Sequence, residues 1–253
     1  MAWAASASYA STRRSYPRAP DANVALSVQF GLIYEICRPE PFDGWASEAE
    51  IYWQALDQTV LADELGFDYV WAVEHHFLEG YSLSSAPEVF LSAVAQRTER
   101  IRVGHGVRLL PPPFNHPARS AEMAAVLDIM SHGRFDFGVG RSITDQELGG
   151  FKVDPAASRP MLDEVLPEIV RMWTSDPYPG FAGEWFTMPE RQVLPKPLQD
   201  PHPPLWMACT QRARSTWPRT SVSACSRSAS ARRETSSVRC SATKSASRRR
   251  RAR

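Results

Sequence analysis

The 253-residue sequence has few cysteines and no long apolar run. Its four cysteines form no C-x-x-C pair, which argues against a zinc ribbon and against a disulfide framework. No stretch approaches the roughly 18–20 uninterrupted apolar residues of a membrane helix, so we expect no spanning segment and no membrane partner. Hydrophobic residues make up 43% and charged residues 23% of the chain, which is typical of a soluble globular protein.

The net charge of +1 conceals an uneven distribution. Residues 212–253 hold 13 Lys and Arg against the single acid Glu234, whereas residues 27–211 hold 13 basic and 26 acidic residues. The basic segment also has 11 serines and lacks Leu, Ile, Met and Phe. Because such a composition buries too little apolar surface to offset the entropy of ordering, we expect a disordered Arg/Ser-rich tail.

Both ends of the sequence are open to two interpretations. Residues 1–26 are rich in Ala, Ser and Arg, with no acid before Asp21, which fits either a transit peptide or an extension upstream of the natural start near Leu26. Residues 212–253 fit either an out-of-frame reading of a GC-rich gene or a basic extension that binds nucleic acid or an acidic surface. We favour the frameshift, because the composition changes abruptly after Gln211, directly after an expected buried strand. We expect no nucleic-acid partner, since the acidic body would repel phosphates.

The middle segment, residues 27–211, alternates apolar runs of strand type with patterns of helical spacing. Ser47 is a plausible N-cap, Gly66 a helix stop, and Pro87 suits a first helical turn. We expect strands at 28–34, 67–73, 101–107, 135–139 and 204–208, helices at 47–65, 86–97, 117–130 and 158–173, and a small hairpin at 183–194.

Strands and helices that alternate in this way predict an α/β fold with a parallel sheet, either doubly wound or closed into a barrel. A dinucleotide-binding fold needs G-x-G-x-x-G in the first strand-to-helix turn, where this chain has only Gly44. Gly138-Val139-Gly140 also lacks the third glycine. We therefore favour a (β/α) barrel. Residues 27–211 are fewer than the ~200–250 of a closed barrel, so we expect about five βα units and an incomplete barrel.

Polar residues follow the expected strands, where barrel enzymes place their chemistry. The second strand leads into Glu74-His75-His76-Phe77, whose histidines suit acid–base work, metal ligation or pocket lining. Adjacent residues of an extended segment point to opposite sides, so we expect no metal ion that is bound by both histidines. In the third strand, His105 fits a buried residue with satisfied hydrogen bonds better than a catalyst.

Two further features lie at the ends of the third and fourth strands. Gly106 permits close approach of a flat ligand or tight packing against a neighbour. Arg141 suits an anionic or electron-rich ligand, or a salt bridge with Asp145 or Glu147. The residues alone leave both pairs of alternatives open.

Several strings together resemble a known family. They are residues 65–71 (LGFDYVW), 74–77 (EHHF), 127–141 (LDIMSHGRFDFGVGR) and 201–206 (PHPPLW). Over about residues 28–211 the chain resembles the bacterial luciferase-like, flavin-dependent monooxygenases. The resemblance implies a (β/α)8 TIM barrel that uses reduced FMN, supplied by a separate flavin reductase, and O2 to oxidise a small organic substrate. It also implies a homodimer, and some relatives use a deazaflavin for hydride transfer instead.

The resemblance also implies roles for individual residues. His75 and His76 match the paired histidines beside the flavin, the first of which is tied to catalysis. Arg141 matches an arginine at the flavin-side rim. Gly140 occupies the place of the reactive cysteine of luciferases, which argues against light emission.

The flavin phosphate of this family is held after the fifth strand, where this chain has Thr210 and Gln211. A helix start with hydroxyl groups is a good phosphate site. Glu74, Gly106 and Gly140 are the remaining candidate cofactor contacts.

The chain departs from the family after Gln211, where related chains continue with further strand–helix units. We therefore expect an incomplete flavin site and question whether the chain as given is catalytically competent. The alternative function is a non-catalytic barrel fragment that pairs with a complete subunit. Nothing in the sequence compels export, so cytoplasm is the expected location.

Overall fold

The computed structural model describes residues 28–38, 42, 44–208 and 224–226. Within these residues strands alternate with helices, as the apolar spacing predicts. The elements are β1 (Gly31–Tyr34), α1 (Trp45–Leu65), β2 (Tyr69–Ala72), α2 (Pro87–Arg97), β3 (Arg102–His105), β4 (Arg108–Leu109), α3 (Pro117–Met130), β5 (Phe135–Gly140), α4 (Asp145–Gly150), α5 (Ser158–Thr174), β6 (Phe181–Ala182), β7 (Thr187–Met188), β8 (Leu205–Ala208) and β9 (Ala224–Ser226).

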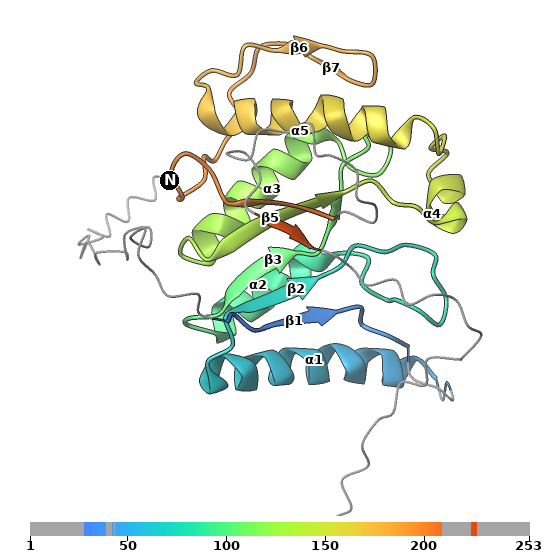
Figure 1. Ribbon diagram of the computed structural model, residues 1–253, viewed down its shortest axis with the longest axis vertical. Helices are drawn as coiled ribbons and strands as arrows, with labels where there is room; N and C mark the ends of the chain where they lie inside the picture. Colours follow the sequence, from blue (N-terminus) through green and yellow to red (C-terminus); the bar gives the residue numbers. More distant parts are fainter. Residues whose placement is uncertain (1–27, 39–41, 43, 209–223, 227–253) are drawn as a thin grey trace, which may run out of the picture.

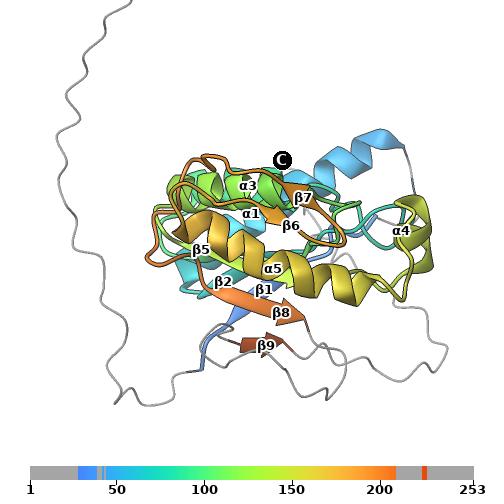
Figure 2. The same ribbon diagram turned by 90° about the horizontal axis from the view of Figure 1, so that it is seen from above.

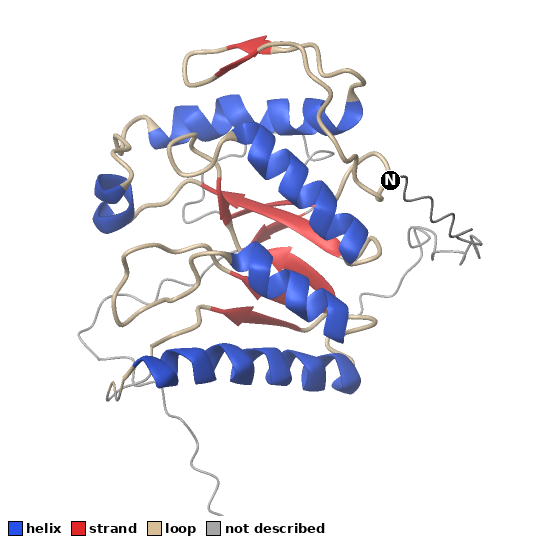
Figure 3. Ribbon diagram, turned by 180° about the vertical axis from the view of Figure 1, so that it is seen from behind, coloured by secondary structure: helices blue, strands red, loops and turns tan. Residues whose placement is uncertain are grey.

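The large sheet is parallel throughout and has the strand order β1-β2-β3-β5-β8-β9, with the short β4 also paired to β5. The helices α1, α2, α3 and α5 cover one face of this sheet (Figures 1 and 3). Seen from above, β8 and β9 lie on the side away from those helices (Figure 2). Within the described part of the chain β1 and β9 are the two ends of the path, so the sheet is open rather than closed on itself.

Local signals account for the ends of several helices. Gly66 adopts the left-handed conformation (φ 86°) that terminates α1, and Pro87 is the first residue of α2. The expected N-cap at Ser47 is wrong, because α1 begins earlier and Gly44 is its N-cap. The Ser47 hydroxyl instead donates to the Gly44 carbonyl oxygen over 2.7 Å. A hairpin is present but lies earlier than the expected residues 183–194: its antiparallel strands are β6 and β7, of two residues each, and only β7 falls within that range.

The main core lies between the sheet and its helices. Val70, Val103, Phe135 and Phe137 have no exposed surface. Burying such a side chain contributes roughly 1.5–3 kcal/mol. On the helix side, the ring of Trp173 meets Phe137 edge-on at 5.3 Å. This packing holds the strand ends, and the loops that follow them, in fixed positions.

His105 is buried as expected, but the expectation of satisfied hydrogen bonds is wrong. Its side chain has no exposed surface, and neither ring nitrogen has a hydrogen-bond partner in the part of the chain that the structure describes. The ring packs edge-on against Phe135 and Phe137 of β5. Burial, and secondarily the charge of Arg108, hold the pKa of His105 well below its usual value, so the ring is neutral.

Two sequence expectations fall largely or wholly outside the described residues. Of residues 212–253 only Ala224–Ser226 are described, as β9, which pairs in parallel with β8. The expected disorder of the tail therefore stays a prediction, as do the interpretations of residues 1–26. No described helix is long and apolar enough to cross a membrane.

Candidate functional site

The loops that follow β1, β2 and β5 begin at the same edge of the parallel sheet, on the right in Figure 1. Glu35 follows β1, His75 and His76 follow β2, and Glu147 lies on α4, which follows β5. Ligands of parallel α/β proteins bind at the carboxyl ends of the strands. The candidate site is therefore built from residues far apart in the sequence.

Glu147 joins the loops after β2 and β5. Its side chain has no exposed surface. One carboxylate oxygen accepts from the Nδ1 atom of His75 (2.9 Å) and the backbone N–H of His76 (3.0 Å). The other oxygen accepts from the hydroxyl groups of Ser142 (2.6 Å) and Thr144 (2.7 Å). Burial alone would raise the pKa of Glu147, but these four donors lower it to about 2, so the carboxylate is ionised.

His75 lies between carboxylates. Its Nδ1 atom contacts Glu147, and its Nε2 atom lies 3.5 Å from Oε2 of Glu35. The ring also meets the ring of Tyr81 edge-on at 5.6 Å. Burial alone would lower the pKa of His75, but the hydrogen bond and charge of Glu147, with the charges of Glu35 and Glu74, raise it overall. His75 is thus disposed to hold a second proton near neutral pH.

His76 lies in a different environment from its neighbour. Its Nε2 atom is 3.3 Å from Oε1 of Glu74, and its ring meets Phe151 edge-on at 5.0 Å. Phe77, the next residue, has a positive φ of 60° and contacts Phe151 as well. The two adjacent histidines therefore face different carboxylates, as the alternation of an extended segment predicts.

Glu74 is a buried carboxylate whose oxygens are used within the protein. Oε2 accepts from the backbone N–H of Leu109, and Oε1 accepts from the side-chain amide of Asn115, both over 2.8 Å. Arg108 lies 3.6 Å away and also bonds to Glu88. These contacts position His76. A direct contact of Glu74 with a cofactor stays a prediction.

Arg141 follows β5, and its guanidinium donates to the hydroxyl of Ser158 at the start of α5 over 2.7 Å. Among the described residues Arg141 forms no salt bridge, so the pairing with Asp145 or Glu147 that the sequence left open is not what the structure contains. Glu147 bonds to His75 instead. A contact of Arg141 with a ligand stays a prediction.

The glycines at this edge are explained by close packing of neighbouring side chains. A Cβ atom on Gly106 would lie 3.0 Å from Cβ of Trp71, and one on Gly140 would lie 2.3 Å from a methyl carbon of Val107. Any side chain at position 140, cysteine included, would require Val107 to move. Tight packing, one of the two interpretations of Gly106, is therefore present, and a contact of either glycine with a cofactor stays a prediction.

The sequence pointed to the histidines but assigned no site role to Glu147. A local signal was available, because Thr144-x-x-Glu147 is a capping-box pattern at the start of a helix. Thr144 is indeed the N-cap of α4, and its hydroxyl accepts from the backbone N–H of Glu147. What no local signal conveys is that Glu147 also reaches His75, because that contact joins two loops 72 residues apart.

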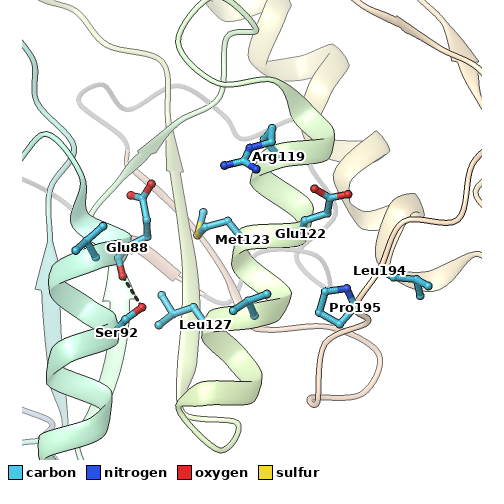
Figure 4. Close-up of a pocket in the computed structure, with 10 residues that line it drawn as sticks. Glu88, Ser92, Arg119, Glu122, Met123, Leu127, Leu194 and Pro195 are labelled. Atoms are coloured by element: carbon cyan, nitrogen blue, oxygen red, sulfur yellow. Dashed lines mark hydrogen bonds between the residues drawn. The ribbon is translucent and has the colours of Figure 1, made fainter. Parts of the chain in front are cut away.

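The remaining candidates lie elsewhere. Thr210 and Gln211 fall outside the described residues. The described segments contain no group of three or more His, Cys, Asp and Glu side chains that could hold a metal ion. A surface groove of about 420 Å³ lies between α2 and α3, lined by Glu88, Met123 and Leu194 among others (Figure 4). None of the candidate site residues lines it.

Comparison with known proteins identifies relatives of this sequence. The family described as "Luciferase-like monooxygenase" matches residues 36–216. An uncharacterised protein y4wF of Sinorhizobium fredii is 36% identical over 65% of this chain and 48% of its own length. The oxygenase component of a flavin-dependent trigonelline monooxygenase of Acinetobacter baylyi is 31% identical over 64% of this chain and 44% of its own length.

Solved structures show the same fold. Monooxygenase RslO1 of Streptomyces bottropensis has a TM-score of 0.65 and 34% identity, covering 72% of this chain and 53% of its own. The oxygenating constituent of 3,6-diketocamphane monooxygenase of Pseudomonas putida, in complex with FMN, has a TM-score of 0.63 at 21% identity, covering 72% and 52%. The open parallel sheet is thus part of a luciferase-like (β/α)8 TIM barrel.

This chain spans about half the length of the relatives it matches. The match nevertheless covers well over half of the chain itself. It also includes the loops that hold His75, His76 and Glu147. The chain therefore belongs to the luciferase-like monooxygenase family.

Proposed function

We propose that this protein is the oxygenase part of a flavin-dependent monooxygenase, which uses reduced FMN and O2 to oxidise a small organic substrate. The observation that carries the proposal is the pair His75 and His76 at the carboxyl edge of the sheet, each held by a buried carboxylate. Membership of the luciferase-like monooxygenase family supports the same reaction class. Active sites of barrel enzymes lie at this edge.

The side chains at this edge fit the polar rim of a flavin ring. His75 and His76 are partly exposed, at 23% and 18% of their side chains, and can reach a ligand. Oε2 of Glu35 is buried and has no hydrogen-bond partner among the described residues. Arg141 uses one terminal nitrogen on Ser158, and a guanidinium has five N–H donors, so it retains donors for an electron-rich ligand.

Each side chain then has a stated task. Arg141 would bind and orient the cofactor, with the phosphate held beyond β8 at Thr210 and Gln211. His75 would hold a proton at Nε2 next to the reacting ligand, and His76 would line the pocket beside it. Reduced FMN, when bound, supplies the electrons that activate O2. Glu74, Gly106 and Gly140 would shape the flavin side of the pocket.

The proposal extends to partners and location. The name of the Acinetobacter relative describes an oxygenase component, which supports a separate flavin reductase as the source of reduced FMN. We further propose a homodimer and a cytoplasmic location. Light scattering of the purified chain tests the dimer, and a monodisperse monomer would exclude it. Fractionation of the source cells tests the location.

A deazaflavin is the second candidate cofactor. An F420-dependent secondary alcohol dehydrogenase shares the fold, with a TM-score of 0.60 at 23% identity, and supports keeping this alternative. In that case the protein would transfer a hydride and would need no O2. The third candidate is a non-catalytic barrel fragment that pairs with a complete subunit.

Binding and turnover measurements separate these candidates. The full chain is titrated with FMN and, separately, with a deazaflavin, and flavin fluorescence is followed. We expect FMN to bind and Arg141→Met to weaken binding, while His132→Gln, at the opposite end of β5, leaves it unchanged.

Oxygen consumption with photoreduced FMN is then compared with that of free flavin across aldehydes, alkanes and ketones. Oxygenated product above the free-flavin level supports the monooxygenase. Binding of the deazaflavin alone would replace FMN in the proposal. Absence of binding by both flavins would contradict catalysis by this chain and favour the fragment.

A further inference from the structure

Glu147 is a buried carboxylate that forms hydrogen bonds with both candidate histidines. It accepts from the ring of His75 and from the backbone of His76, and it lies on an element that follows a different strand. We propose that Glu147 is a positioning residue that holds one proton of His75 on Nδ1 and thereby makes Nε2 the atom that exchanges a proton with the ligand. This inference rests on the proposed function.

The side chain of Glu147 is held in one orientation. Its side chain has no exposed surface, and Ser142 and Thr144 both donate to the oxygen on the far side from His75. Thr144 is also the N-cap of α4, so the same hydroxyl ties the carboxylate to the start of the helix. With its position set from behind, Glu147 presents the other oxygen to His75.

The hydrogen bond to Glu147 determines where His75 carries its first proton. A carboxylate accepts hydrogen bonds only, so the Nδ1 atom at 2.9 Å must be the donor. A neutral His75 therefore carries its proton on Nδ1 and leaves Nε2 without one. Fixing the tautomer of a histidine through its other nitrogen is a general effect of such carboxylate partners.

The other ring nitrogen of His75, Nε2, lies near acidic and aromatic side chains. Glu35 lies 3.5 Å from Nε2, Tyr81 packs edge-on against the ring, and Glu74 adds a further negative charge nearby. The charges that raise the pKa of His75 come from the carboxylates of Glu147, Glu35 and Glu74. The surroundings therefore favour a second proton, on Nε2, until a ligand takes it.

The proton transfer from His75 to a ligand breaks one bond of the imidazolium, at Nε2. The Nε2–H bond of the imidazolium breaks, and its proton goes to an oxygen atom of the bound ligand. The Nδ1–H bond remains and is still donated to Glu147, so the ring becomes neutral in one defined tautomer. A proton from water restores the imidazolium.

The competing explanation is that Glu147 only holds the loops after β2 and β5 together. A variant that keeps the shape of this side chain but removes its charge distinguishes that role from the positioning of the His75 proton. Glu147→Gln retains an oxygen that faces His75, and its amide can pair with the hydroxyls of Ser142 and Thr144. Ser142→Ala is the matched control, because it removes one support of the carboxylate and leaves its charge in place. Glu35→Gln removes charge from the Nε2 side instead.

The measurement is an NMR titration of the full chain with isotope-labelled histidine, in which His75→Asn identifies the His75 signal. In the unmodified protein we expect a His75 pKa above 6.5 and, at high pH, the Nδ1–H tautomer. In Glu147→Gln we expect the pKa to fall by about one unit or more. Ser142→Ala should shift it by less, and Glu35→Gln should lower the pKa but leave the tautomer unchanged.

Two results would overturn the inference. One is a His75 pKa in Glu147→Gln that stays within a few tenths of the unmodified value, as expected if Glu147 only holds the two loops together. The other is an Nε2–H tautomer in the unmodified protein at high pH. Circular dichroism confirms that each variant is folded, and Glu35→Gln, away from the Ser142 and Thr144 contacts, remains informative if Glu147→Gln is not.

The titration needs no flavin, so its outcome is independent of the proposed function. The positioning role can fail while FMN still binds, and FMN binding can fail while Glu147 still sets the tautomer of His75. If both hold, the pH profile of turnover should shift in Glu147→Gln in the same direction as the His75 titration.

Discussion

The two adjacent histidines differ in the charges that surround their carboxylate partners. Each contacts a buried carboxylate, Glu147 for His75 and Glu74 for His76. Glu74 also has Arg108 at 3.6 Å, a cation that does not lose its charge. Within the part of the chain that the structure describes, the hydrogen-bond donors to Glu147 are His75 and three neutral groups, the hydroxyls of Ser142 and Thr144 and the backbone N–H of His76. The charge of Glu147 is therefore available to hold a proton on His75.

This difference shows why two histidines that look alike in sequence need not share a role. The other groups that contact each carboxylate, rather than the histidine itself, determine whether a nearby cation neutralises the negative charge of that carboxylate. In the proposed function His75 is therefore the histidine that holds a proton for the ligand, whereas the ring of His76 packs edge-on against Phe151. Substitutions that exchange or remove these partners test the comparison directly.

The largest expected effect is the removal of the carboxylate on the His75 side. Glu147→Leu leaves four donors without an acceptor inside the protein, and we expect it to lower the free energy of unfolding at pH 7 by about 3 kcal/mol. Glu147→Gln keeps an acceptor and should cost less. Urea denaturation measures both, and equal losses would mean that the lost negative charge, not the lost hydrogen-bond acceptor, determines the effect.

The pH dependence of this contribution follows from the lowered pKa of Glu147, about 2 against an ordinary 4.5. A carboxyl group with a lowered folded-state pKa stabilises the protein above its unfolded pKa and loses that effect as pH falls. The difference in stability between the unmodified chain and Glu147→Gln should therefore shrink between about pH 5 and pH 2. A difference that stays constant over this range would contradict the assignment.

The prediction for His75 has the opposite sign. Its folded-state pKa is raised above 6.5, so its contribution to stability is complete below 6.5 and is lost as pH rises through the folded-state pKa. We expect the loss caused by His75→Asn to be larger at pH 5.5 than at pH 9. Thermal or urea unfolding at the two pH values measures it. A larger loss at pH 9 would show that His75 is bound as the neutral form.

The smallest effect is expected on the other side of the comparison. His76→Leu keeps an apolar contact with Phe151 and removes one 3.3 Å contact with Glu74, which retains Leu109 and Asn115 as donors. We expect a change of less than about 1 kcal/mol in the free energy of unfolding. A loss as large as that of Glu147→Leu would remove the distinction between the two histidines.

The sequence predicted the long elements well and the short ones poorly. The helix Pro117–Met130 has the bounds that its apolar spacing predicts, since several turns of periodic pattern define it. The two-residue strand Arg108–Leu109 and the six-residue helix Asp145–Gly150 were not predicted, because they are too short for a period to be visible. The latter carries Glu147, so the missed helix is also the missed part of the site.

The candidate site shows a similar limit. His75 and His76 could be found because they follow a recognisable strand, and their opposite orientations follow from extended geometry. The partner of Arg141 could not be found in the same way. Nearby acids suggested a salt bridge, whereas the structure pairs Arg141 with Ser158, the first residue of the next long helix. Such contacts depend on how loops from separate strands meet, which local patterns do not encode.

The most direct test of the account follows the histidine ring signals of the full chain by NMR while FMN is added. Proximity to the bound flavin should move the signals of His75 and His76. His132 and His202, which precede β5 and β8 at the opposite edge of the sheet, serve as internal controls and should not move. Unchanged His75 and His76 signals at FMN concentrations that saturate binding would contradict the placement of the site.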